Sequence, residues 1–124
     1  MERILVVEDD RILNMTLSYN LKSAGYEVES VMNAADAEAI AGEHQFALVV
    51  LDVNLPDGNG YEVCRTIKEK QDAAVIFVTA QDMESDMLKG YECGADDYVT
   101  KPFSVAVFQK KVAAILSRIE KKQV

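Results

Sequence analysis

The chain of 124 residues has no tryptophan, one histidine, two cysteines and two prolines. The two cysteines, Cys64 and Cys93, lack Cys-x-x-Cys spacing, which argues against a zinc site and against a disulfide framework. Both fall within helical patterns, so we expect buried free thiols. His44 lies in a short polar connection, where a metal-binding or phosphoacceptor role is not expected.

Long apolar runs are also missing, and none approaches the length of a membrane span. The sequence begins with Met-Glu-Arg-Ile, which leads straight into a strand pattern where a secretory signal would have its apolar segment. Basic residues are few: 13 Lys and Arg against 21 Asp and Glu leave a net charge of −8. We therefore expect a cytoplasmic protein that contacts neither membranes nor nucleic acid and offers a surface for cations or proteins.

Short apolar runs alternate with amphipathic segments along the whole chain. The length suits one domain, which we place at residues 1–119, with residues 120–124 as a tail or the start of a linker. The expected strands are 4–7, 26–31, 46–51, 74–78 and 96–99; the expected helices are 11–24, 34–42, 60–70, 83–93 and a last one that begins near Ser104. This alternation predicts an α/β fold, a doubly wound five-stranded parallel sheet with five helices, for which the flavodoxin-like strand order 2-1-3-4-5 is one of two common solutions.

Polar residues follow the apolar strands where each strand ends. Glu8 and Asp9 follow the first strand, Asp52 the third, Thr79 the fourth and Lys101 the fifth. Because the carboxyl ends of parallel strands share one edge of a sheet, we expect three acids, a hydroxyl and a lysine to converge there.

Three neighbouring carboxylates repel one another unless a cation is present. Oxygen ligands without His or Cys favour Mg²⁺, with Mn²⁺ as an alternative, and Mg²⁺ in proteins commonly meets phosphate. The Asp52 carboxylate could accept a phosphoryl group, which Lys101 and the Thr79 hydroxyl would then contact. A structural ion pair between Asp52 and Lys101 is the simpler alternative for these two residues alone.

Four segments resemble the receiver domain of two-component response regulators. They are residues 4–10 (Ile-Leu-Val-Val-Glu-Asp-Asp), 51–58 (Leu-Asp-Val-Asn-Leu-Pro-Asp-Gly), 78–80 (Val-Thr-Ala) and 94–103 (Gly-Ala-Asp-Asp-Tyr-Val-Thr-Lys-Pro-Phe). The likeness covers essentially the whole chain in matching order. It implies that Asp52 accepts a phosphoryl group from a sensor histidine kinase, in a reaction that needs Mg²⁺, and that the chain later dephosphorylates itself.

The same resemblance assigns roles to the other residues of the site. Asp9, Asp52 and the backbone carbonyl of Asn54 would bind the Mg²⁺ ion, and Glu8 would hold it mainly through water. Asn54, with Gln81, would also influence how long the phosphoryl group survives.

The resemblance also implies a switch and an output surface. Thr79 and Tyr98 would form the switch pair, Lys101 would contact the phosphate, and the Lys101–Pro102 peptide would be cis. The surface of the fourth helix, fifth strand and last helix would then control a partner or an attached output domain.

In the winged-helix transcription-factor branch, which the chain resembles most, this surface forms a homodimer after phosphorylation. In that branch, crossed pairs of opposite charge join the two copies. This chain has charges of matching sign on the two sides of the surface: acids at Glu92, Asp96 and Asp97, and bases at Lys111 and Arg118. Met87 departs from the pattern, because a basic residue is common at that position. The output would be transcription, through a DNA-binding domain that is absent from this chain.

Three other functions fit the fold class. A flavin-binding module would need a phosphate-binding loop after the first strand, where this chain has Glu8, Asp9 and Asp10. A Mg²⁺-dependent phosphatase acting on a diffusible substrate would need a second acid two residues after Asp52, where this chain has Asn54. A phosphate-independent interaction module would be expected to have lost acids or the lysine, and all are present.

Overall fold

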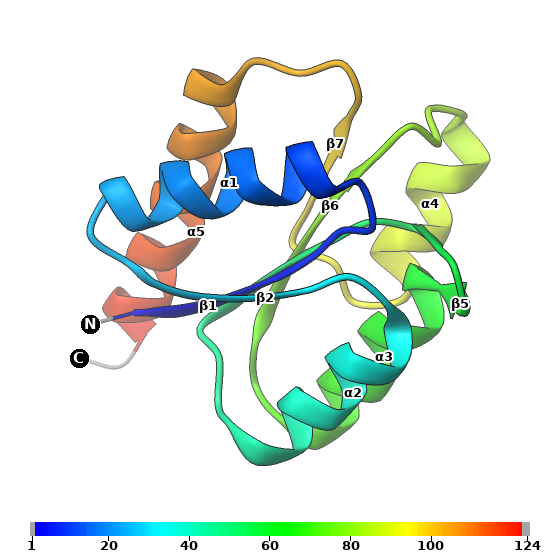
Figure 1. Ribbon diagram of the computed structural model, residues 1–124, viewed down its shortest axis with the longest axis horizontal. Coiled ribbons are helices and arrows are strands. Elements are labelled where there is room, and N and C mark those ends of the chain that lie inside the picture. Colours follow the sequence, from blue (N-terminus) through cyan, green and yellow to red (C-terminus); the bar gives the residue numbers. More distant parts are fainter. Residues whose placement is uncertain (1, 123–124) are drawn as a thin grey trace.

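The computed structural model describes residues 2–122, and its centre is a five-stranded parallel sheet (Figure 1). The strands run in the order β2-β1-β3-β6-β7 and comprise Glu27–Val31 (β2), Arg3–Val7 (β1), Leu48–Leu51 (β3), Ala74–Thr79 (β6) and Asp97–Thr100 (β7). All four pairings are parallel. Counted by the strands of this sheet, the order is 2-1-3-4-5, so the predicted flavodoxin-like architecture is confirmed.

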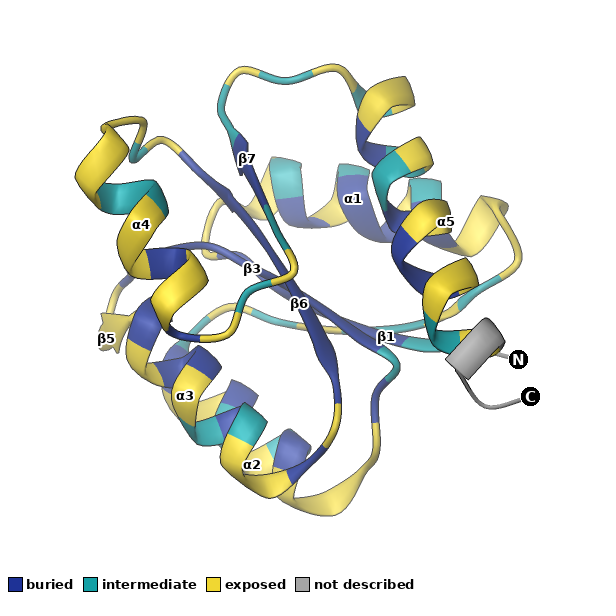
Figure 2. Ribbon diagram, turned by 180° about the vertical axis from the view of Figure 1, so that it is seen from behind, coloured by how far each residue is buried: buried dark blue, intermediate teal, exposed yellow. Residues whose placement is uncertain are grey.

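Helices cover both faces of the sheet (Figures 1 and 2). One face carries α1 (Arg11–Ser23) and α5 (Val105–Lys122); the other carries α2 (Ala34–Glu43), α3 (Gly60–Lys70) and α4 (Glu84–Glu92). Strand residues alternate between the two layers. Ile4 and Val6 of β1 pack in the α1 and α5 layer, whereas Leu5 and Val7 pack in the α2 and α3 layer. Within the described residues there are five helices, as predicted.

Polar side chains fix the first turn of several helices. The Asp10 carboxylate accepts from the Leu13 N–H at 3.1 Å, and the Ser104 hydroxyl accepts from the Val107 N–H at 3.2 Å. At the other end of α1 and α4 the chain turns through Gly25 and Gly94, whose φ values of 99° and 101° lie in the left-handed region that glycine enters freely. The two polar caps lead the chain into a helix, and the two glycines lead it from a helix towards the following strand.

The boundaries differ from the expectation in a few places. Strand β3 begins at Leu48, later than expected, because the Phe46 N–H donates to the Gln71 side chain at 2.8 Å and not to the sheet. After β3 the chain forms a small antiparallel hairpin, β4 (Asn54–Leu55) and β5 (Gly58–Asn59), which we did not predict.

Helix α5 is long and continues to Lys122. Of the expected tail at residues 120–124, the last two lie outside the described residues. No helix in the described range is both long and apolar enough to cross a membrane.

Candidate functional site

Three carboxylates meet at the carboxyl edge of the sheet. Glu8 and Asp9 follow β1 and Asp52 follows β3, and one oxygen from each lies within 4.8 Å of the others. Glu8 and Asp52 are 2% and 4% exposed, whereas Asp9 is open to solvent. The parallel sheet therefore brings Asp52 to Glu8 and Asp9 although it is far from them in sequence.

Lys101 follows β7 and reaches across to two of these acids. Its Nζ donates to Asp52 Oδ2 at 2.8 Å and to Glu8 Oε1 at 2.9 Å. The ion pair between Asp52 and Lys101 that we considered as an alternative is thus present, but Glu8 shares the ammonium. One ammonium among three carboxylates leaves two negative charges without compensation in the described site when all the acids are ionised.

Burial and charge shift two pKa values at this edge. Burial raises the pKa of Glu8 to about 7, and the nearby charge of Asp52 adds to the rise, although hydrogen bonds from the Asp10 N–H and Lys101 oppose it. Burial alone would lower the pKa of Lys101, but its hydrogen bonds to Asp52 and Glu8 and their negative charge outweigh it, so the pKa of Lys101 is raised. The pocket therefore favours a cation, and without a metal Glu8 is harder to ionise than an ordinary glutamate.

Backbone and amide groups hold the acids in place. The Asp10 N–H donates to Glu8 Oε2 and the Asn54 N–H to Asp52 Oδ1, both at 3.0 Å. Sequence reasoning missed Asn14, whose buried side-chain amide donates to the Glu8 carbonyl at 2.9 Å and ties the acidic loop to α1. A signal was available, because Asn14 is a polar residue on the same helical stripe as Leu17.

Gly60 opens α3 directly against the loop that carries Asp52. Its N–H donates to the Val53 carbonyl at 2.8 Å, and a Cβ at this position would collide with the backbone carbonyl of Asp52. This close approach requires glycine at position 60. It was missed because the sequence marks Gly60 only as a turn residue.

Thr79, Gln81 and Tyr98 form a second hydrogen-bonded group beside the acids. Thr79 ends β6 and is fully buried, and its Oγ1 accepts from the Gln81 N–H at 3.3 Å. The Tyr98 hydroxyl donates to the Gln81 carbonyl at 2.8 Å. Tyr98 is 8% exposed, so its ring lies inward. The structure thus connects the predicted switch pair through the backbone of one residue.

Gly90 of α4 makes room for the inward ring of Tyr98. A Cβ built on Gly90 would lie 2.8 Å from the ring of Tyr98 and 3.3 Å from that of Phe77. The rings of Phe77 and Tyr98 pack against each other with 5.7 Å between their centroids. The sequence shows Gly90 only as a weak helix former, and its contact with Tyr98 depends on how α4 is placed over the sheet.

The predicted dimer residues differ in their contacts: some are exposed, and others are already engaged in ion pairs within the chain. Asp97 pairs with Lys111 of α5 at 3.2 Å, while Glu92 and Arg118 are exposed. The Asp96 carboxylate is engaged at the other side of β7. It accepts from the Val75 N–H at 2.8 Å and pairs with Lys68 of α3 at 3.2 Å.

Other residues singled out in the sequence are Met87, the two cysteines and the Lys101–Pro102 pair. Met87, where the winged-helix branch commonly has a basic residue, packs partly buried against the core. Cys64 and Cys93 are buried and not bonded to each other, as predicted, and burial raises the pKa of the Cys64 thiol to about 11. The Lys101–Pro102 peptide is cis, as the resemblance implied.

The donor set of the acidic cluster fits Mg²⁺. Every candidate ligand is a carboxylate oxygen, from Glu8, Asp9 and Asp52, and no His or Cys lies among them. The exposed position of Asp9 leaves the cluster open to the waters that Mg²⁺ retains.

Residues 4–113 match the model of the response regulator receiver domain, and the chain belongs to this family. Receiver domains bind Mg²⁺ at an acidic pocket and interact with histidine kinases, and some dimerise on activation.

Solved structures agree with this assignment. The BeF₃-activated receiver domain of DrrB is 41% identical to the chain over 94% of this chain and 98% of its own, with a TM-score of 0.87. DrrB in a longer form, a Thermotoga maritima OmpR/PhoB homologue, is 41% identical over 95% of this chain and 54% of its own, with a TM-score of 0.86. The non-phosphorylated HemR receiver domain from Leptospira biflexa is 38% identical over 94% of this chain and 95% of its own, with a TM-score of 0.89. The predicted resemblance, including its likeness to the winged-helix branch, is confirmed.

Proposed function

We propose that Asp52 accepts a phosphoryl group from the phosphohistidine of a sensor histidine kinase and later loses it by hydrolysis. The observation that carries this proposal is the placement of the Asp52 carboxylate, which lies within the acidic cluster and 2.8 Å from the Lys101 ammonium. A nucleophilic carboxylate beside an ammonium and an oxygen-lined cation site is the arrangement that phosphoryl transfer needs.

In the transfer step, an oxygen of Asp52 bonds to phosphorus while the bond from phosphorus to the kinase histidine nitrogen breaks. The nitrogen leaves with the electron pair. Lys101 neutralises charge on the phosphoryl oxygens, and the buried Thr79 hydroxyl would donate to one of them. In hydrolysis, a water oxygen bonds to phosphorus, the bond to Asp52 breaks, and the carboxylate and inorganic phosphate are released.

Asp9, Asp52 and the Asn54 carbonyl would hold Mg²⁺, with Glu8 acting mainly through water. When bound, the ion supplies positive charge to the phosphoryl oxygens and offsets the two uncompensated negative charges of the cluster. Mn²⁺, which takes the same oxygen ligands, would serve in its place.

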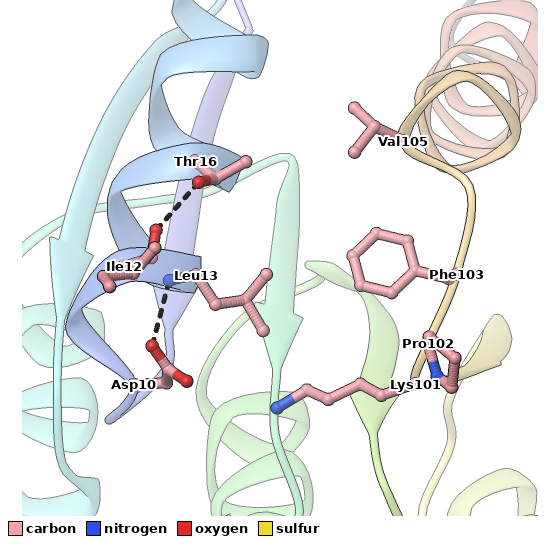
Figure 3. Close-up of a pocket in the computed structure, with 8 residues that line it drawn as sticks. All are labelled: Asp10, Ile12, Leu13, Thr16, Lys101, Pro102, Phe103 and Val105. Atoms are coloured by element: carbon pink, nitrogen blue, oxygen red, sulfur yellow. Dashed lines mark hydrogen bonds between the residues drawn. The ribbon is translucent and has the colours of Figure 1, made fainter.

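Partner binding would use two surfaces. A groove of about 440 Å³ between the start of α1 and the loop before α5 adjoins Lys101 and carries apolar side chains such as Leu13 and Phe103 (Figure 3). Ile12 of α1 also lines the groove and is 77% exposed. A histidine kinase that docked here would bring its phosphohistidine to the edge where Asp52 lies.

The second surface is formed by α4, β7 and α5, which lie side by side (Figure 2). Phosphorylation would draw Thr79 towards the phosphoryl group and stabilise the inward Tyr98, so that this surface favours a homodimer. Leu88 and Val107, which are 55% and 53% exposed, would join the Asp97–Lys111 pair in the contact. We place the protein in the cytoplasm, with residues 120–124 leading into a linker and a DNA-binding domain that regulates transcription.

The test is mass spectrometry after incubation with acetyl phosphate and Mg²⁺. Wild type is expected to gain the mass of one phosphoryl group, and Asp52→Asn is expected to gain none. A chelator should prevent the gain. An equal gain in Asp52→Asn would contradict the assignment of the phosphoacceptor.

A further inference from the structure

We infer that Asp57 is a positioning residue for the proposed Mg²⁺ site, because its carboxylate joins the β4–β5 hairpin to the start of α2. This inference rests on the metal site of the proposed function, in which the Asn54 carbonyl binds the ion. It gives a role at that site to a residue that the sequence, with Gly58 beside it, marks only as a turn former.

The Asp57 carboxylate accepts from two backbone groups of a helix that begins 23 residues earlier in the chain. Its Oδ1 accepts from the Ala34 N–H at 2.7 Å, and its Oδ2 accepts from the Ala35 N–H at 2.9 Å. Both N–H groups belong to the first turn of α2, where a helix offers them no partner of its own. Each oxygen holds one of them, so the contact fixes direction as well as distance. The same hydrogen bonds lower the pKa of Asp57, which keeps the carboxylate ionised at neutral pH.

The hairpin carries this fixed position to the loop of the proposed site. Strands β4 and β5 pair from Asn54 to Asn59, and Asp57 lies in the tight turn between them. Because the strands are paired, a displacement of the turn displaces Asn54 as well. The Asn54 N–H donates to Asp52 Oδ1 at 3.0 Å, so this residue also touches the phosphoacceptor. The contact between Asp57 and α2 therefore helps to set where the Asn54 carbonyl lies relative to the acids.

The other attachments of the hairpin leave its turn to Asp57. Leu55 is buried in the layer of α2 and α3, but burial of apolar surface is non-directional. The Asn59 side chain accepts from the Glu62 N–H at 3.0 Å and so holds the second strand to α3. Residues 56–59 are exposed. The two hydrogen bonds of Asp57 thus orient a turn that lies on the surface.

NMR titration of the metal-free chain with MgCl₂ tests this role, with the amide signals of Asp9 and Asn54 as reporters. Asp57→Ala removes both hydrogen bonds to α2. We expect the dissociation constant for Mg²⁺ to rise about three- to tenfold in this variant.

Asn33→Ala is the matched control, because it removes the other cap of the same helix. The Asn33 side chain accepts from the Asp36 N–H at 2.8 Å, a contact that is local to α2. Its loss weakens the start of α2 without removing the hydrogen bonds of the hairpin, so the dissociation constant should equal that of wild type.

Asp57→Asn separates the hydrogen bonds from the charge. It loses the same negative charge as Asp57→Ala but keeps one oxygen that can accept from the Ala34 or Ala35 N–H. It should therefore bind Mg²⁺ more tightly than Asp57→Ala. This conservative variant also serves if Asp57→Ala fails to fold.

Hydrogen exchange gives a second measure that needs no phosphorylation. If the hydrogen bonds of Asp57 favour Mg²⁺ binding, bound Mg²⁺ strengthens these hydrogen bonds by the same factor. The amides of Ala34 and Ala35 should therefore exchange more slowly in wild type with MgCl₂ than without it. The Asp36 amide, which bonds to Asn33 in the same turn, should not change.

The outcomes separate the two proposals. If wild type binds Mg²⁺ but gains no phosphoryl group from acetyl phosphate, the proposed phosphorylation fails and the role of Asp57 at the metal site is still decided by the titration. If wild type is phosphorylated but Asp57→Ala binds Mg²⁺ as wild type does, the inference alone is overturned. Equal dissociation constants in Asp57→Ala and Asp57→Asn, or an equal rise in Asn33→Ala, would also overturn it, as would unchanged exchange at Ala34 and Ala35.

Discussion

Glu8 and Asp52 are carboxylates buried at the end of the sheet, and a single ammonium from Lys101 contacts both. A buried carboxylate is costly unless it is paired or protonated. For Glu8 burial outweighs the hydrogen bonds from the Asp10 N–H and Lys101, and its raised pKa is the measurable result. A divalent cation would remove the cost by favouring the ionised form.

We predict that the metal-free protein loses stability as the pH rises through the titration of Glu8. The pKa of Glu8 is about 7 in the folded chain against 4.5 for an ordinary glutamate, so between these values the folded chain binds more protons than the unfolded chain. Its free energy of unfolding should therefore fall over this range by on the order of 1–3 kcal/mol.

Urea denaturation at a series of pH values measures this effect, with Glu8→Gln as the comparison because glutamine does not titrate. The variant should lack the decline, and saturating Mg²⁺ should reduce it in wild type. Parallel pH profiles for the two metal-free proteins would show that Glu8 is not its source.

At Gly60 we predict a strong effect from the addition of one methyl group. Gly60→Ala would force a Cβ against the Asp52 carbonyl, and the loop would have to shift. We expect the free energy of unfolding to drop by about 2–4 kcal/mol and phosphoryl incorporation to slow. Gly58→Ala is the control, because its Cβ would lie 3.5 Å from Ala34 Cβ, an ordinary contact. Equal denaturation midpoints for the two variants would contradict the role of the close approach.

At the scale of elements, α4 is the helix least attached to the core, since Gly90 is its one buried residue. Alanine is a better helix former than glycine by about 1 kcal/mol. A Cβ on Gly42 of α2 would meet nothing within 4 Å. Gly42→Ala should therefore raise the free energy of unfolding by about this amount.

The free energy of unfolding of Gly90→Ala should be about 1–3 kcal/mol lower than that of Gly42→Ala, because the added Cβ overpacks the site against the Tyr98 ring. In a Tyr98→Ala background this shortfall should shrink to what the 3.3 Å contact with Phe77 leaves. Denaturation of these variants measures both effects. A shortfall that stays undiminished without the Tyr98 ring would place the clash elsewhere.

The sequence was sufficient for the helix count and the convergence of Glu8, Asp9 and Asp52, because hydrophobic periodicity and parallel topology determine them. The same reasoning narrowed the sheet order to two common solutions, of which the structure has the flavodoxin-like one. The ends of elements were less predictable. Phe46 reads as a strand residue by its apolar character, yet its N–H bonds to the side chain of Gln71, 25 residues away in sequence.

Contacts that depend on tertiary placement could not be inferred. The Gln81 carbonyl accepts from Tyr98, and the Asp96 carboxylate turns to Val75 and Lys68. Every residue has a backbone carbonyl, so the sequence cannot show that the one of Gln81 accepts from Tyr98. The sequence also cannot show which neighbours an exposed carboxylate such as that of Asp96 will contact. These are the residues at which the structure adds most to the site.

For the whole molecule we predict a dimer that depends on the phosphorylated state. With beryllofluoride and Mg²⁺, sedimentation velocity should show a shift from monomer to dimer. Lys111→Glu should weaken the shift, because it breaks the Asp97–Lys111 pair within each chain and puts a negative charge where the proposed dimer needs a positive one opposite the acids of its partner. Lys22→Glu on α1 changes the net charge equally and should leave the shift intact. Identical profiles with and without beryllofluoride would refute the dimer.

The thin attachment of α4 also bears on the energetics of signalling. Because the one buried residue of α4 is a glycine, this helix buries little apolar surface. Tilting it would therefore cost little of the hydrophobic free energy that stabilises the domain. The two arrangements of such a helix can then be nearly equal in free energy. One added phosphoryl charge is enough to tip a balance that close, while the sheet beneath stays as it was.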